Sequence, residues 1–286
     1  MPELPEVHTI AADLDEAVRG LTIVEAAVGC EKIIPGGVKD FRRRLAGARI
    51  DEVRRLGKWL HFRLSKTSGP AHLLVHLKMT GQFQLGPWPG LRWPKHVHAA
   101  LRLAGRPAAS EALLYRDIRK FGRLQAFNQA GFEAFLKELN QGPDPLTMTA
   151  EEFHSRLTAR RGRLKTVLLD QTTVVGFGNI YVDESLFAAR LSPLASAAGL
   201  NQAETGRLFS AARRIFSAAI AARGSTTSNY QGLKGGGNYQ ASHQVYGRAG
   251  QPCPVCGTAI LKMVVGGRST QVCPACQPEP PNPGPE

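Results

Sequence analysis

The chain lacks the features that would place it in a membrane or export it. No apolar run reaches the roughly 18–20 residues that a membrane-spanning helix needs. The N-terminal MPELPEV carries two acidic residues and no basic segment followed by an apolar one, which excludes a secretory signal. Cysteine is scarce, with five among 286 residues, and nothing else in the chain points to an oxidising compartment. We therefore expect a cytoplasmic protein.

Acidic residues are also few. The 23 Asp and Glu residues stand against 36 Lys and Arg, which leaves a net charge of +13 and suggests a polyanionic partner, most often nucleic acid. Basic proteins without such a partner are common, so the net charge alone does not establish that the chain binds nucleic acid. Hydrophobic residues make up 43% of the chain, enough for real cores, so wholesale disorder is excluded. The length predicts two domains and a small appendage.

Four of the five cysteines form the pattern C-x2-C-x16-C-x2-C at Cys253, Cys256, Cys273 and Cys276. Each C-x2-C pair can bend around one ion, and two pairs complete a closed tetrahedral thiolate shell. The spacer has the length of a two-stranded hairpin. Two disulfides are the alternative, but the pattern favours one structural Zn²⁺. Cys30 is interpreted as a small buried residue.

Hydrophobic periodicity predicts a different architecture for each half of the chain. A helix is expected at 5–18, where Pro5 suits the first turn. Short antiparallel strands that form a sandwich or barrel are expected next, at 21–28, 49–56, 59–64, 72–77, 97–103 and 124–127. After 142–145 the period is helical, with capping motifs at Thr149 and Asn201 and further helices from 164 and 180. The last ten residues contain five prolines and predict a disordered tail.

Three features carry possible chemistry. Loss of Met1 would leave Pro2 as a secondary amine able to form an iminium ion, with Glu3 beside it to move protons. Glycines before a helix at 174–179 would expose N–H groups to phosphate, with Asn179 as cap and donor. Basic clusters in both halves suggest a cleft that grips one polyanion. Each feature also has a simpler interpretation. Met-Pro-Glu is a common and stable N-terminal sequence, the glycines at 174–179 can form an ordinary turn, and the basic residues can be solvent-exposed charges without a ligand.

Six motifs in one order give the chain a resemblance to the formamidopyrimidine-DNA glycosylase family. They are PELPEV at 2–7, Lys58 in RRLGKWL, HLKMTG at 76–81, DIRKFG at 117–122, VVGFGNIYVDESLF at 174–187, and QVYGRAGQPCPVCGTAI at 244–260 with R-x4-C-x2-C at 268–276. The resemblance implies an α+β multidomain protein that initiates base excision repair. The implied activity is that of a bifunctional glycosylase and abasic-site lyase that removes oxidised purines from double-stranded DNA. A monomer is expected.

The same resemblance implies the domain organisation. An N-terminal antiparallel β-sandwich with an N-terminal helix is expected at 1–137, and a helix–two-turn–helix DNA-binding domain at 138–229. A Gly-rich lesion-lid loop at 230–248, a four-cysteine zinc finger with its β-hairpin at 249–277 and a disordered tail at 278–286 complete the chain.

Site roles follow from the matched motifs. Pro2 resembles the nucleophile that attacks C1′ of the damaged nucleotide and Glu3 its acid/base partner. Lys58 resembles the lysine associated with β-elimination, and Arg268 the arginine associated with δ-elimination. The residues that resemble further DNA contacts are His96, Arg119, Arg160, Lys165 and Asn179, and those that resemble the base-void filling wedge are Met79, Arg119 and Phe121.

Two positions depart from the family pattern. His8 stands where the family usually has Glu, and Val97 where it usually has Asp. The lid loop varies too much within the family for its sequence to indicate which damaged base is preferred. Two alternatives therefore remain: an endonuclease VIII-like enzyme for oxidised pyrimidines, and a catalytically silent zinc-containing DNA-binding protein. Leu4 and the set Met79, Arg119 and Phe121 favour the purine enzyme.

Overall fold

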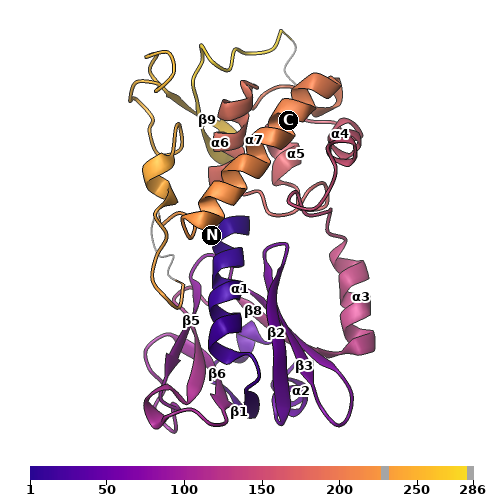
Figure 1. Ribbon diagram of the computed structural model, residues 1–286, viewed down its shortest axis with the longest axis vertical. Coiled ribbons are helices and arrows are strands. Elements are labelled where there is room, and N and C mark those ends of the chain that lie inside the picture. Colours follow the sequence, from indigo (N-terminus) through magenta and orange to yellow (C-terminus); the bar gives the residue numbers. More distant parts are fainter. Residues whose placement is uncertain (227–231, 282–286) are drawn as a thin grey trace. The chain divides into compact units, whose positions relative to one another are not determined.

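The computed structural model describes residues 1–226 and 232–281 and divides into two compact units (Figure 1). Unit 1 comprises Met1–Leu139 and Arg223–Gly237, and unit 2 comprises Asn140–Ala222 and Asn238–Glu286. Parts of the expected lid loop and tail, at 230–231 and 282–286, lie outside the described residues. No helix in the described ranges is long and apolar enough to cross a membrane.

Unit 1 is built on one antiparallel sheet. Its eight strands are β1 (Thr22–Val28), β2 (Ala48–Leu56), β3 (Trp59–Ser65), β4 (Ala71–His76), β5 (Gly81–Gly86), β6 (Val97–Leu103), β7 (Ala112–Asp117) and β8 (Arg123–Asn128), in the order β5-β7-β6-β1-β2-β3-β4-β8. β5 and β3 hold the first and sixth places, yet the rings of Phe83 and Phe62 lie 5.9 Å apart. Since neighbouring strands are about 4.8 Å apart, the sheet must curl until its halves face each other. This confirms the sandwich expected from the sequence.

Helix α1 (Leu4–Val18) covers the core of this sheet, as predicted. Its apolar stripe places Val7, Ile10 and Leu14 in the core with at most 3% of each exposed. On its edge, the Asp15 carboxylate accepts the backbone N–H of Val53 in β2 at 2.7 Å, which fixes the helix on the sheet. Two shorter helices, α2 (Val38–Leu45) and α3 (Gln129–Leu139), were not predicted.

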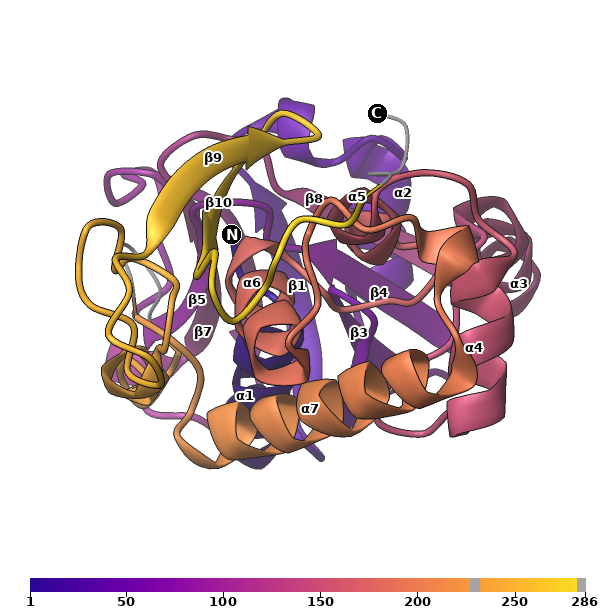
Figure 2. The same ribbon diagram turned by 90° about the horizontal axis from the view of Figure 1, so that it is seen from above.

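Unit 2 is helical and ends in a hairpin. Its helices are α4 (Ala150–Thr158), α5 (Leu164–Leu169), α6 (Asn179–Ala189) and α7 (Gln202–Ala221), and its strands are β9 (Leu261–Val265) and β10 (Arg268–Val272). Both predicted caps are confirmed: Thr149 accepts the N–H of Glu152 at 3.1 Å, and Asn201 accepts that of Glu204 at 2.9 Å. Helix α6 is buried on nearly all sides, between α7 and the β9–β10 hairpin (Figure 2).

The segment after α7 returns to unit 1. The Ser225 N–H donates to Glu6 at 2.8 Å, Arg223 pairs with Asp13 at 2.7 Å, and Lys234 pairs with Glu16 at 2.5 Å. These bonds to three positions along α1 explain why 223–237 groups with unit 1, although the sequence assigned residues up to 229 to the helical domain.

Candidate catalytic and DNA-binding site

The N-terminal residues are buried and held in place. Pro2 is buried, and only 3% of Glu3 is exposed, immediately before α1 begins. The N–H of Glu3 donates to one carboxylate oxygen of Glu6 at 2.8 Å, and the other oxygen accepts the N–H of Ser225 at 2.8 Å. The Pro2–Glu3 peptide is therefore tied to the 223–226 segment through Glu6, which the sequence reasoning did not single out.

Lys58 lies in the two-residue turn between β2 and β3. Gly57 takes the first central position with φ 57°, a conformation that glycine adopts without strain. Only 5% of Lys58 is exposed, which is rare for lysine. Burial, helped by the charges of Lys78 and Lys58, lowers the pKa of His76 to about 3. His76 is therefore neutral at neutral pH, in agreement with its Nδ1 accepting the N–H of Lys78 at 3.0 Å.

The structure brings the three predicted wedge residues together. The guanidinium of Arg119 lies 4.6 Å from the ring centroid of Phe121, and its Nη1 lies 2.7 Å from Sδ of Met79. Met79 is 47% exposed and Phe121 43%, so two large apolar side chains extend into solvent around one cation. Exposed apolar and planar side chains of this kind are suited to insertion between bases.

A buried carboxylate organises the two turns that carry this wedge. Asp117, fully buried, accepts the hydroxyl of Thr80, the N–H of Arg119 at 3.1 Å and the N–H of Gly122 at 2.8 Å. Its own N–H donates to the carbonyl of His96 at 2.9 Å. The sequence reasoning missed this residue, although an acid inside the DIRKFG motif was a signal for it.

Three non-glycine residues around Asp117 have positive φ. They are Lys78 at 53°, His96 at 67° and Lys120 at 56°. Such conformations cost on the order of 1–3 kcal/mol each and cluster at functional sites. The predicted DNA contact His96 is thus held in a strained turn beside the wedge.

The predicted DNA contacts of unit 2 differ in their surroundings. Arg160 is exposed and donates to the Thr172 hydroxyl at 3.0 Å. Asn179 is the first residue of α6, and the cap is Gly178 instead. The Asn179 amide nitrogen donates to the carbonyl of Ser269 at 2.7 Å, while its amide oxygen is buried without a partner among the described residues.

Lys165 was expected to contact phosphate, but its side chain is buried. Its side chain is 0% exposed and its ammonium lies 2.7 Å from the carboxylate of Asp183, itself 0% exposed. Of the glycines expected to expose N–H groups to phosphate, Gly176 instead donates its N–H to the side chain of Gln171 at 2.9 Å. The basic cluster in the sequence gave no sign that one of its lysines is an interior residue.

The chain entering the finger is anchored on α6. The buried carboxylate of Glu184 accepts the N–H groups of Gln244 at 2.9 Å, Val245 at 3.0 Å and Tyr246 at 2.8 Å. Hydrogen bonds to a carboxylate stabilise its charge, so these three N–H groups fasten the chain to α6. Tyr239, from the expected lid loop, is buried against Tyr181 of the same helix.

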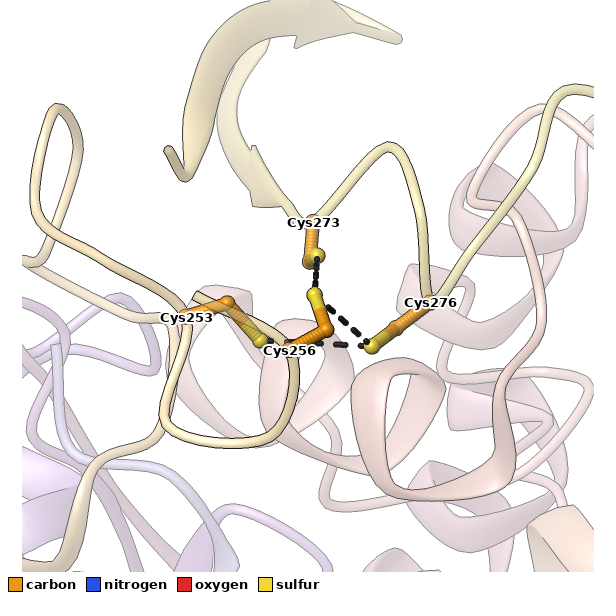
Figure 3. A group of neighbouring side chains, drawn as sticks. All are labelled: Cys253, Cys256, Cys273 and Cys276. Carbon is orange, nitrogen blue, oxygen red and sulfur yellow. Dashed lines mark hydrogen bonds between the residues drawn. The ribbon is translucent and has the colours of Figure 1, made fainter. Parts of the chain in front are cut away.

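The four predicted cysteines converge (Figure 3). Their sulfur atoms all lie within 4.8 Å of one another. Cys253 and Cys256 come from the loop before β9, and Cys273 and Cys276 from the end of β10 and the turn after it. Separations of 3.4 Å between Cys256 and Cys273 and 3.9 Å between Cys253 and Cys276 exceed a disulfide and are close to the edge of about 3.8 Å of a tetrahedral zinc–thiolate site.

The chemistry of these thiols also fits a cation. Burial raises the pKa of Cys276 to about 12, and hydrogen bonds with the neighbouring thiols act in the same direction. Four clustered thiolates therefore require a positive charge among them, which a structural Zn²⁺ supplies. The side chain of Arg268 is exposed on the same hairpin, at the start of β10.

The two departures from the family pattern lie in different settings. His8 is exposed on α1, one turn after Leu4. Val97 is buried in a small apolar cluster with Ala100 and Leu114, where a carboxylate would be costly. The aliphatic residue at 97 therefore suits its own surroundings.

Comparisons with known proteins cover nearly the whole chain. The formamidopyrimidine-DNA glycosylase N-terminal domain matches residues 1–124, the H2TH domain of the same enzyme 141–231, and the zinc finger found in FPG and IleRS 250–278. The formamidopyrimidine-DNA glycosylase of Streptococcus pyogenes serotype M18 is 38% identical over 98% of this chain and 100% of its own. That of Thermomicrobium roseum is 41% identical over 97% and 99%.

Solved structures agree with this assignment. A mutant of the Lactococcus lactis protein in complex with Fapy-dG containing DNA has a TM-score of 0.88 and 31% identity, over 97% of this chain and 100% of that one. The MutM (FPG) protein from Thermus thermophilus has a TM-score of 0.84 and 39% identity, over 98% and 100%. With the buried N-terminal Pro2–Glu3 pair, the exposed cluster of Met79, Arg119 and Phe121 and the four-cysteine hairpin in place, the chain belongs to the formamidopyrimidine-DNA glycosylase family of bifunctional DNA glycosylases and abasic-site lyases.

Proposed function

We propose that this chain excises oxidised purines, 8-oxoguanine and formamidopyrimidines, from double-stranded DNA and then cleaves the strand by β- and δ-elimination. The relatives support the substrate class: the Lactococcus lactis protein is solved with Fapy-dG containing DNA, in a mutant form, and with abasic site containing DNA, and MutM is solved with carbocyclic 8-oxo-G containing DNA. The observation that carries the proposal is the buried Pro2–Glu3 pair at the start of α1.

Pro2 acts as nucleophile once Met1 has been removed. Its secondary amine forms a bond to C1′ of the damaged nucleotide while the bond from C1′ to the base breaks, and the base leaves with a proton that Glu3 supplies. The nitrogen then loses its proton, the C1′–O4′ bond breaks and O4′ takes up a proton, so that the sugar ring opens to an iminium, which acidifies the C2′ proton. Removal of that proton expels the 3′ phosphate, and a second elimination expels the 5′ phosphate. Lys58 provides the positive charge beside the sugar in the first elimination, and Arg268 holds phosphate in the second.

The remaining site residues bind DNA. Arg160, Asn179 and His96 contact the backbone, and the exposed cluster of Met79, Arg119 and Phe121 fills the space that the extruded base leaves. The protein acts as a monomer. Cysteine is scarce, and four of the five cysteines have a metal-ligand spacing, which fits a reducing compartment, so the cytoplasm is the site of action.

A lesion panel tests the proposal. Matched duplexes carry 8-oxoguanine, a formamidopyrimidine, thymine glycol or a pre-formed abasic site, all at one salt concentration because phosphate contacts make affinity salt-dependent. We expect preferential excision of the two oxidised purines and cleavage at the abasic site. Preference for thymine glycol would indicate an endonuclease VIII-like enzyme, and binding without cleavage of any duplex would indicate a silent DNA-binding protein.

A further inference from the structure

We infer that Lys165 is a positioning residue that, with Asp183, fixes the strand carrying Arg268, and that it does not bind phosphate itself. The inference rests on the proposed function, because the DNA contact of Arg268 is part of that proposal. Its starting point is burial: the side chains of Lys165 and Asp183 are both 0% exposed, and their charged atoms lie 2.7 Å apart. A phosphate could reach this ammonium only if the pair opened and left a carboxylate buried without its cation.

The hydrogen bonds of Lys165 lead to Arg268 in two steps. The ammonium, which can only donate, gives a bond to the hydroxyl of Thr270 at 2.8 Å. That hydroxyl keeps its own hydrogen and donates it to the carbonyl of Arg268 at 3.1 Å. Thr270 is fully buried, so water does not compete for this link. The position of the Arg268 backbone therefore depends directly on the charge of Lys165.

The residues on either side of Thr270 are fastened as well. The carbonyl of Ser269 accepts from Lys165 at 3.1 Å and from the Asn179 amide at 2.7 Å. The N–H of Gln271 donates to the second carboxylate oxygen of Asp183 at 3.0 Å. Three consecutive residues of β10 are thus bound to α5 and α6. A flexible side chain such as arginine is placed accurately only when its backbone is held in this way.

The two roles of Lys165 predict different salt dependences of DNA binding. A cation that neutralises one phosphate contributes about 0.9 to the slope of log K against log salt. The test uses the full zinc-containing chain and a duplex with a tetrahydrofuran abasic analogue, which is not cleaved. The proteins compared are the wild type, Arg268→Ala, Lys165→Met and the double variant. We expect each single variant to lower the slope by about 0.9 and the double variant to lower it no further.

Asp183→Asn separates the two roles most sharply. It removes the partner of Lys165 and keeps the lysine charge. A phosphate ligand released from its ion pair would bind DNA as well as before or better. We expect the opposite: the slope falls as in Lys165→Met, and on an abasic substrate the products shift from δ- towards β-elimination as in Arg268→Ala.

Two further variants guard against a misfolded finger. Thr270→Val keeps both buried charges and removes the link to the Arg268 carbonyl, so we expect the same shift towards β-elimination with one zinc per chain retained. Lys262→Met removes an exposed charge from the same hairpin. Lys262 does not act through Arg268. When Lys262→Met is combined with Arg268→Ala, we therefore expect the effects of the two substitutions on the slope to add.

The inference is overturned if the double variant lowers the slope by about 1.8, twice the single effect. It is also overturned if Asp183→Asn and Thr270→Val give wild-type slopes and product ratios. Failure of the proposed function looks different: the wild type itself would not cleave the abasic duplex, or Arg268→Ala would change neither slope nor products.

Discussion

The carboxylate of Glu6 accepts the backbone N–H of Ser225 at 2.8 Å, across 219 residues of sequence. The other oxygen of the same carboxylate accepts the N–H of Glu3, next to the proposed nucleophile. Gly224, with φ 84°, has no room for a side chain there, since a Cβ would lie 2.7 Å from Glu6. The position of Pro2 therefore depends on the segment that follows α7.

Replacement of Glu6 by Gln should impair both chemical activities. An amide offers one acceptor oxygen where two N–H donors need one each, so one buried donor loses its partner at a cost of about 1–3 kcal/mol. We expect slower 8-oxoguanine excision and slower abasic-site cleavage, because both use Pro2, with binding to a tetrahydrofuran duplex unchanged. Glu16→Gln is the matched control on the same helix, since Glu16 is 69% exposed and its ion pair with Lys234 is a surface pair that contributes little to stability. Equal losses in both variants would contradict this role for Glu6.

Loss of the metal should unfold the finger and leave unit 1 folded. Cys256→Ser and Cys273→Ser each remove one ligand, and a structural zinc site supplies the folding free energy of its hairpin. We expect one zinc per chain in the wild type by elemental analysis, none in the variants and a collapse of DNA affinity.

Fluorescence gives this zinc experiment an internal control. All three tryptophans, Trp59, Trp88 and Trp93, lie in unit 1, so their unfolding transition in urea reports that unit alone. This transition should stay at the wild-type position, and Cys30→Ala should keep both zinc and affinity. A metal-free preparation with full activity would refute the assignment.

The wedge residues Met79 and Phe121 should be needed for activity only on substrates in which the damaged base is still stacked in the duplex. Phe121→Ala and Met79→Ala remove apolar surface that replaces the extruded base, a step worth a few kcal/mol. We expect excision of 8-oxoguanine from duplex to fall about tenfold or more, with cleavage of a pre-formed abasic site much less affected.

Asp117→Asn should give the same selective defect as the wedge variants. An amide in that place cannot accept from the Thr80 hydroxyl and from both N–H groups at once, so the turns that carry Met79 and Phe121 lose their common anchor. Equal losses on stacked and abasic substrates would point to general misfolding.

The sequence predicts the elements with clear periodicity or capping motifs and misses those without. Helix α1 and the hairpin with its four cysteines follow from an apolar stripe and a ligand spacing. Strand β7 is buried on both faces along most of its length, so it shows no alternation, and α2 has only three apolar positions within a basic run.

The candidate site likewise contains residues whose placement the sequence predicts and residues whose placement it does not. Motif residues such as Met79 and Phe121 are found together as expected, because local motifs specify turns. The interior position of Lys165 was not predictable, since its partners at 183 and 269–270 are distant in sequence and a lysine among arginines looks solvent-exposed.

Two stacked histidines should make unit 1 sensitive to acid. Arg54 donates to Nδ1 of His61 at 3.4 Å, so Nε2 of His61 donates to Nδ1 of His72 at 2.9 Å, and Nε2 of His72 donates to Gln129 at 2.8 Å. Every ring nitrogen is thereby assigned and both rings are neutral. Burial lowers the pKa of His61 to about 3 and, with nearby arginines opposed by Gln129 and Glu133, also lowers the pKa of His72.

The sign of the pH dependence follows from these depressed pKa values. Below about pH 6.5 the unfolded chain binds protons that the folded chain does not, so stability is complete above that pH and falls as the pH drops, by up to about 1.4 kcal/mol per unit for one histidine. His61→Gln should show a smaller loss between pH 6 and 4 in urea titrations followed by tryptophan fluorescence. His8→Gln, at an exposed site, should behave as the wild type. Parallel pH profiles for all three proteins would contradict the prediction.

The nucleophile is tested by its need for a free chain end. An internal proline is a tertiary amide without an available lone pair, so any residue retained before Pro2, even Met1, should abolish iminium formation. Such a protein should still bind a tetrahydrofuran duplex, because its phosphate contacts are intact and supply most of the affinity. The processed protein, incubated with 8-oxoguanine duplex and borohydride, should give a covalent adduct that peptide mapping places on Pro2, since reduction converts the iminium into a stable amine. Lys58→Met in the processed protein should still form this adduct. An adduct on Lys58 in the blocked protein, formed at the normal rate, would show that the lysine is the nucleophile.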